Sequence, residues 1–130
     1  MVSVEEILQS KSDRTVWTTA ATTPVGDAMR LMADKGIGAL VVVDGSEMVG
    51  IVTERDYARK TLGASRNPGE FLVRDIMSAP VICVRPDQTS EDCVRLMAVN
   101  AMRHLPVVEA GRLVGMVSIR DLVDRIIDLL

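Results

Sequence analysis

The chain has 130 residues, of which 48% are hydrophobic and 2% aromatic, and its formal net charge is −3. This length suits one compact domain or two very small ones, with a core of aliphatic side chains and methionine. The acidic balance and the scarcity of aromatic rings argue against nucleic-acid binding, which needs positive charge and stacking surfaces. The longest obvious apolar run, residues 39–43, is too short to cross a bilayer, so we expect no membrane segment.

The cysteines and the first residues indicate a compartment. Cys83 and Cys93 do not form a Cys-x-x-Cys pattern, and we interpret them as small apolar residues of a reducing environment. The beginning of the chain has neither the basic stretch nor the apolar stretch of a signal peptide. We therefore expect a cytoplasmic protein.

The first half of the chain alternates helical and extended patterns. Ser3 and Glu6 form a capping pattern before an apolar helix face. Thr22-Thr23-Pro24 supplies a cap and a first-turn proline for the next helix. The predicted elements are a helix at 3–9, a strand at 15–19, a helix after Pro24 that ends at Gly36, strands at 39–43 and 48–52, a helix from Thr53 to about 62, and a turn-rich linker at 63–69.

The second half repeats this order. The predicted elements are a strand at 81–84, a helix from Thr89 to about Asn100, strands at 105–108 and 113–117, and a final helix that starts at Ser118. Residues 16–62 match the residues 65 positions later at 14 of 47 positions without a gap. The leading segments, Val4-x-x-Ile7-Leu8 and Val73-x-x-Ile76-Met77, match at an offset of 69.

These matches divide the chain into two repeats. Residues 1–62 hold a leading helix and the first repeat, residues 63–72 a linker, and residues 73–130 the second repeat. Each repeat is too small to bury its own sheet well. We expect an α/β (α+β) fold in which two β-α-β-β-α repeats pack sheet to sheet with pseudo-twofold symmetry, forming two related clefts.

One motif recurs at the end of both repeats. Residues 49–56 and 114–121 each contain an apolar run, a hydroxyl residue and an Asp three places later. A helix that begins there presents free N–H groups to an anion, and the Asp can accept hydrogen bonds from the two hydroxyls of a ribose. The same spacing is also a common capping box. The Arg before each Asp favours a binding site, because capping does not require it.

The motifs that carry a family resemblance are residues 40–44, 50–56, 105–108 and 115–121. Their repeated pattern resembles the CBS domain, and the whole chain is similar to a tandem CBS pair, or Bateman module. It looks most like small standalone bacterial CBS proteins that bind adenine nucleotides. The resemblance implies that the Asp holds the ribose hydroxyls and the Ser or Thr helps to hold phosphate, while adenine inserts between strands with help from the other repeat.

Carried onto this chain, the resemblance implies two sites for AMP, ADP, ATP or NAD(P)(H), with no bound cofactor. One site combines Thr53, Arg55 and Asp56 with Ile82, Met102, Arg103 and His104. The other combines Ser118, Arg120 and Asp121 with Ser12, Val16, Trp17, Ile37, Gly38 and Ala39. Because Arg103-His104 in the second repeat is Gly38-Ala39 in the first, the two sites are expected to differ in how they hold phosphate.

Three residue types have alternative interpretations. His104 is a half-buried strand residue or a phosphate contact. Trp17 is a core anchor or a wall of the adenine pocket. Arg55 and Arg120 are solvated surface residues or phosphate contacts, and the second option better explains cations in the first turn of a helix.

Catalysis is not expected. One histidine and two separated cysteines form no metal cluster, and the sequence has no P-loop and no nucleophile elbow. We predict a regulatory or sensor module that binds adenine nucleotides and acts on an unknown downstream protein. A dimeric scaffold without nucleotide and an S-adenosylmethionine-binding CBS pair stay open. Residues 122–130 are apolar on more than one helix face, which predicts a homodimer through the helices.

Overall fold

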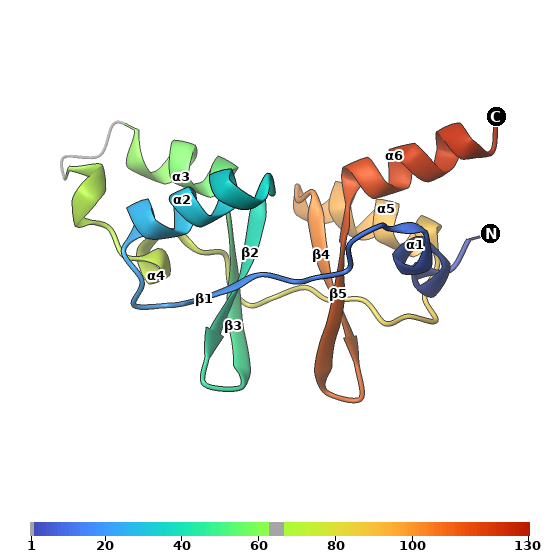
Figure 1. The fold of residues 1–130 in the computed structure, drawn as a ribbon, viewed down its shortest axis with the longest axis horizontal. Coiled ribbons are helices and arrows are strands. Elements are labelled where there is room, and N and C mark those ends of the chain that lie inside the picture. The colour runs from blue at the N-terminus through green and yellow to red at the C-terminus, as the bar shows by residue number, and fades with distance from the viewer. Residues whose placement is uncertain (1, 63–66) are drawn as a thin grey trace. The chain divides into compact units, whose positions relative to one another are not determined.

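The computed structural model describes residues 2–62 and 67–130, so residues 63–66 of the predicted linker lie outside the described residues (Figure 1). Two compact units result: unit 1 is Met1–Val16 with Ile82–Leu130, and unit 2 is Trp17–Val81. The elements are α1 (Val4–Ser10), β1 (Thr18–Ala20), α2 (Val25–Lys35), β2 (Ala39–Asp44), β3 (Glu47–Thr53), α3 (Glu54–Thr61), η1 (Pro68–Glu70), α4 (Val73–Ile76), α5 (Ser90–Asn100), β4 (His104–Glu109), β5 (Arg112–Ser118) and α6 (Ile119–Asp128).

Unit 2 contains a three-stranded sheet in the order β1-β2-β3. Strand β1 runs parallel to β2, and β2 pairs antiparallel with β3 across the predicted hairpin. Leu40 and Val42 of β2 lie on one face of the strand and form one core with the apolar faces of the helices, while Val41 on the other face is also buried. This core consists of Val25, Ala28, Met32, Leu40, Val42, Val52, Phe71, Val73 and Ile76.

Unit 1 contains the antiparallel pair β4-β5, which packs with α1, α5 and α6. Its core consists of Val4, Ile7, Leu8, Val84, Cys93, Met97, Leu105, Val107, Val117 and Leu122. The mixture of helices with two small sheets confirms the predicted fold class. No helix in the described ranges is both long and apolar enough to span a bilayer.

The leading helices are exchanged between the repeats. Helix α1 precedes the first repeat in sequence but packs in unit 1, where Val4 N–H donates to Gln88 O at 2.8 Å and Ser90 N–H donates to Val2 O at 2.8 Å. In unit 2, Val73 N–H of α4 donates to Thr23 O at 2.8 Å. Each compact unit therefore joins one sequence repeat to the helix that precedes the other.

This exchange explains the glycine in the recurring motif. A Cβ at Gly115 would lie 2.7 Å from a methyl carbon of Leu8, and a Cβ at Gly50 would lie 2.6 Å from Sδ of Met77. Leu8 and Met77 occupy matching positions of the two leading segments. The glycine is required for close packing of the leading helix, whatever the neighbouring Asp binds.

The predicted strand at 81–84 is wrong, since only Val84 pairs, through one parallel bridge to Val107. Pro106 explains why the ladder stops. At the matching position of the first repeat, Val41 N–H donates to Trp17 O at 3.2 Å, but a proline has no N–H to donate. The other predicted first strand, at 15–19, is present as the shorter and later β1.

The predicted threonine cap of α2 is also wrong. Pro24 itself occupies the cap position, with no side-chain hydrogen bond. Thr23 is engaged elsewhere, because its carbonyl accepts the Val73 N–H of the exchanged leading segment. The predicted C-terminal cap is confirmed, with Gly36 in the left-handed conformation at φ 65°.

Ala101, the counterpart of Gly36, caps α5 in the left-handed conformation at φ 51°. A side chain is strained in this conformation, so Ala101→Gly should raise the free energy of unfolding by roughly 1 kcal/mol. Chemical denaturation measures the change. A loss of stability would show that the greater entropy of unfolded glycine outweighs the relieved strain.

Candidate functional site

The two recurring motifs form strand-to-helix junctions with the same local geometry. Thr53 Oγ1 accepts the Asp56 N–H at 3.0 Å, and Asp56 Oδ2 accepts the Thr53 N–H at 3.0 Å. The matching distances for Ser118 and Asp121 are 3.1 and 2.9 Å. Both junctions are therefore complete capping boxes, as the structural alternative predicted.

The residue that precedes the neighbouring strand, β2 or β4, supplies a further hydrogen bond to each junction. Glu54 N–H donates to Gly38 O at 3.2 Å, and Ile119 N–H donates to Arg103 O at 2.9 Å. The N–H groups of the following residues, Arg55 and Arg120, have no acceptor within the described part of the chain. Each junction thus keeps an N–H group in its first turn for an external oxygen.

A third capping box, at the start of α5, shows that a hydroxyl residue and an Asp at this spacing do not by themselves identify a binding site. Thr89 and Asp92 begin α5 with distances of 3.1 and 3.0 Å, the same arrangement as at the junctions. Its second helical residue is Glu91, where the junctions have Arg55 and Arg120. A carboxylate there complements the helix dipole but repels an anionic ligand. The arginine, not the hydroxyl and Asp pair, separates the candidate sites from an ordinary helix start.

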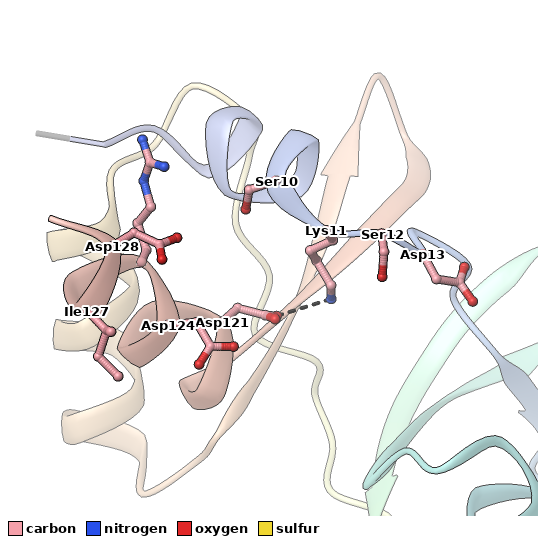
Figure 2. Close-up of a pocket in the computed structure, with 9 residues that line it drawn as sticks. Ser10, Lys11, Ser12, Asp13, Asp121, Asp124, Ile127 and Asp128 are labelled. Carbon is pink, nitrogen blue, oxygen red and sulfur yellow. Dashed lines mark ion pairs between the residues drawn. The ribbon is translucent and has the colours of Figure 1, made fainter.

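Lys11 lies beside the second junction, which the sequence analysis missed. Its Nζ donates to Met116 O at 2.8 Å and lies 3.1 Å from Asp121 Oδ2. Figure 2 shows the two side chains facing each other from the loop after α1 and the first turn of α6. Both border a cavity of about 470 Å³, also lined by Ser10, Ser12, Asp13, Asp124, Arg125, Ile127 and Asp128. Residue spacing could not reveal Lys11, because it lies in the loop that differs in length between the repeats.

The first junction has a different neighbour. Ser78 Oγ lies 3.4 Å from Asp56 Oδ1. The nearby lysine of this unit, Lys60, donates instead to Ile76 O at 3.0 Å and Met77 O at 3.4 Å, at the end of α4. The two Asp side chains therefore have unlike partners, although their caps match.

The predicted site residues are distributed over both units. Unit 1 contains Ser12, Val16, Ile82, Met102, Arg103, His104, Ser118, Arg120 and Asp121, and unit 2 contains Trp17, Ile37, Gly38, Ala39, Thr53, Arg55 and Asp56. In each unit, the first residue of one strand pairs with the hydroxyl residue that ends the neighbouring strand. His104 of β4 pairs with Ser118 of β5, and Ala39 of β2 pairs with Thr53 of β3. Ser12 and Asp121 line the same cavity. The contributions predicted from one repeat to the motif of the other stay predictions.

His104 is half-buried beside Ser118. Burial lowers its pKa from 6.5; the negative charge of Asp121 acts in the opposite direction, and the positive charges of Lys11 and Arg103 lower it further. The imidazole is therefore mainly neutral at neutral pH. It can donate one hydrogen bond to a phosphate, or take up a proton when a phosphate binds.

The lowered pKa of His104 predicts a pH dependence of stability. Since the folded state binds this proton less tightly than the unfolded state, the contribution is fully present above pH 6.5 and is lost as the pH falls through the folded pKa. Thermal unfolding between pH 8 and 5 should show a smaller acid-induced loss in His104→Asn than in the unchanged protein. Identical pH profiles of the unfolding temperature in the two proteins would show that His104 does not cause the acid-induced loss.

Trp17 packs against the core of unit 2, at its edge. Lys35 Nζ lies 4.4 Å from the centroid of its ring, a cation–π contact that covers part of one face. The contacts within unit 2 fit the core-anchor interpretation, and a role in an adenine pocket stays a prediction.

Other reactive side chains form no second centre. Burial, with a smaller effect of Asp92, raises the pKa of the Cys93 thiol to about 11, and burial also raises the pKa of Cys83. Both thiols are thus poor nucleophiles. In the described ranges, no group of three or more His, Cys, Asp or Glu residues could hold a metal ion.

The fold and the paired junctions define a class of protein. The family model of the CBS domain matches residues 4–63 and 73–128, so the chain belongs to the CBS domain family and contains two CBS domains. These boundaries follow the sequence repeats and not the compact units.

Comparison with individual proteins agrees with this assignment. An uncharacterized protein of Methanopyrus kandleri is 38% identical over 123 residues, which cover 93% of this chain but 61% of that protein. The structure of a putative signal-transduction protein with CBS domains from Burkholderia ambifaria is 48% identical, with a TM-score of 0.94, and 98% of this chain and 95% of that chain are covered. The structure of CBSX2 in complex with AMP has a TM-score of 0.79 at 23% identity, with 99% of both chains covered, and this likeness concerns the fold.

Proposed function

We propose that this CBS pair is a non-catalytic regulatory module that binds adenine nucleotides, namely AMP, ADP, ATP or NAD(P)(H), at its two strand-to-helix junctions. The observation that carries the proposal is the duplicated first turn, in which an arginine and an N–H group without a protein acceptor stand beside an Asp carboxylate. The AMP bound to CBSX2, which has the same fold, supports the ligand class.

The chemistry of each junction divides between two groups. The Asp carboxylate accepts hydrogen bonds from ribose hydroxyls while one of its oxygens stays on the capping N–H, as Asp56 Oδ2 does with Thr53. The free N–H of the first turn and the arginine guanidinium donate to phosphate oxygens. Ligand occupancy regulates a partner only if two states of the module bind the nucleotide with different affinities.

Two other functions compete with this proposal. An S-adenosylmethionine site would place a sulfonium beside Arg55 or Arg120, where like charges repel. A scaffold without nucleotide would leave these arginines in the first turn of a helix with no ligand to offset an unfavourable position. Both considerations favour the nucleotide.

Calorimetric titration of the protein, stripped of any co-purified ligand, tests the function. AMP, ATP, NAD(H) and NADP(H) are compared with S-adenosylmethionine. The proposal expects saturable binding of at least one adenine nucleotide and weaker binding of S-adenosylmethionine. If no nucleotide binds, the scaffold replaces the sensor, and if only S-adenosylmethionine binds, the ligand class is wrong.

We also propose that the module forms a homodimer through α5 and α6. These helices border an apolar groove of about 590 Å³ in unit 1. Val94, Ile126 and Leu129 line it with exposed fractions of 47, 56 and 68%. A contiguous apolar helix face of this kind marks an interaction surface, and the same face on a second copy fits it by symmetry.

Light scattering checks the dimer. The unchanged protein should have the mass of two chains, and Ile126→Asp should have the mass of one folded chain. Val99→Asp is the matched control, since Val99 is 77% exposed on α5 but does not line the groove. A folded monomer of the unchanged protein at micromolar concentration would refute the dimer.

A further inference from the structure

The ion pair between Lys11 and Asp121 is half-buried, with 24% and 18% of the two side chains exposed. Asp121 Oδ2 lies within reach of the Lys11 ammonium and also accepts the Ser118 N–H. Because solvent screens a partly buried pair less than a surface pair, Lys11 offsets much of the negative charge of Asp121. The carboxylate that we assign to ribose binding thus has a cationic partner in the second repeat.

The ammonium keeps a donor for an external group. Its three N–H bonds have two protein partners in the described ranges, Met116 O and Asp121. Lys11 borders the cavity beside Asp121, where Figure 2 shows its side chain pointing toward the carboxylate. The remaining N–H can donate to a phosphate oxygen at this junction.

Among the residues that the structure describes, no lysine pairs with Asp56 in the first repeat. Its partner outside the capping box is the Ser78 hydroxyl at 3.4 Å, and the described partners of Lys60 are the main-chain carbonyls of Ile76 and Met77. When the two leading segments are aligned at an offset of 69, Pro80 is the counterpart of Lys11. The leading segment that packs in unit 2 therefore has no cation at this position.

The two junctions also differ in their other charged residues. The second junction has the cations Lys11, Arg103 and Arg120 near the carboxylate of Asp121, and the cavity that Lys11 borders is also lined by Arg125 and by the carboxylates of Asp13, Asp124 and Asp128. At the first junction, the first turn of α3 holds Arg55 between the carboxylates of Glu54 and Asp56. A phosphate group that reaches Lys11 gains an attraction that the Ser78 hydroxyl beside Asp56 does not offer at the first junction.

We infer that Lys11 is a specificity-determining residue that directs nucleotides with two or three phosphates to the second-repeat junction. The less charged nucleosides and monophosphates are left to the first-repeat junction. This inference rests on the proposed nucleotide binding and adds which junction prefers which charge.

Calorimetric titration of adenosine, AMP and ATP into Asp56→Asn, which isolates the second junction, tests the inference. Adding Lys11→Met should weaken ATP binding on the order of 10-fold, the value of one charge-assisted hydrogen bond, and change adenosine binding less than about 2-fold. Lys11→Arg should retain most of the ATP affinity. Lys60→Met is the matched control, because it removes an ammonium that touches no carboxylate, and it should leave ATP binding unchanged.

The possible outcomes distinguish a failure of this inference from a failure of the proposed nucleotide binding. Equal losses for adenosine and ATP would show that Lys11 only supports the fold of the junction, and an unchanged ATP affinity would show that it does not contact phosphate. Either result overturns the inference while nucleotide binding stands. Failure of every nucleotide to bind the unchanged protein would instead overturn the proposed function, and this inference with it.

Discussion

Replacing Gly115 with alanine should lower the free energy of unfolding by about 2 kcal/mol, as overpacking of a closed core does. The added Cβ would lie 2.7 and 2.8 Å from the two methyl carbons of Leu8. Leu8 is fully buried, so its side chain has no free space to move into, and the packing of α1 against β5 must adjust. Urea unfolding measures the loss.

A double variant shows whether the leading helix causes the loss. Leu8→Ala alone should cost about 3 kcal/mol through the cavity that it leaves. In the combined variant the new Cβ occupies part of that cavity, so the total loss should be smaller than the sum. Gly26→Ala is the control, because nothing lies within 4 Å of its added Cβ, and it should stabilise α2 by roughly 0.5–1 kcal/mol. Strictly additive losses in the free energy of unfolding would show that the Cβ added at residue 115 does not clash with Leu8.

Reversing the charge of the first-turn arginine should remove phosphate binding. Arg120→Glu and Arg55→Glu copy Glu91 of α5, the second helical residue of a capping box that we do not assign to a ligand. Each variant should weaken ATP binding at its own junction on the order of 100-fold, since a charge-assisted hydrogen bond is lost and a repulsion is added.

Stability separates this effect from unfolding. A glutamate in the first turn complements the helix dipole, so both variants should be at least as stable as the unchanged protein. Glu91→Arg is the reciprocal control and should leave nucleotide affinity unchanged. Unaltered ATP binding in Arg55→Glu and Arg120→Glu would leave these arginines as surface residues.

The repeat made most of the fold predictable. Hairpins, helix starts and the two junctions follow from local patterns, which recur in the same order, so a correct assignment in one repeat supports the other. The failures arose where tertiary contacts decide. Thr23 does not cap α2 because its carbonyl accepts an N–H from α4, about 50 residues further along the chain. The missing strand at 81–84 had a signal in Pro106, on the neighbouring strand.

The candidate site was predictable in its repeated part only. Thr53, Asp56, Ser118 and Asp121 belong to a pattern that two copies make visible. Lys11 belongs to no pattern, because α1 packs in unit 1 and brings this lysine to Asp121, 110 positions away. Contacts of this kind follow from the exchange of the leading helices, which spacing within a repeat cannot reveal.

The central claim is that the two junctions are the nucleotide sites. Calorimetric stoichiometry of the preferred adenine nucleotide in Asp56→Asn, Asp121→Asn and the double variant tests it most directly. Asparagine keeps a side-chain oxygen for the capping N–H and removes the charge. Asp92→Asn, in the same capping box on α5, is the control for helix stability. We predict that each single variant loses one site, that the double variant loses both, and that Asp92→Asn keeps both. Full binding by the double variant, or an equal loss in Asp92→Asn, would contradict the account.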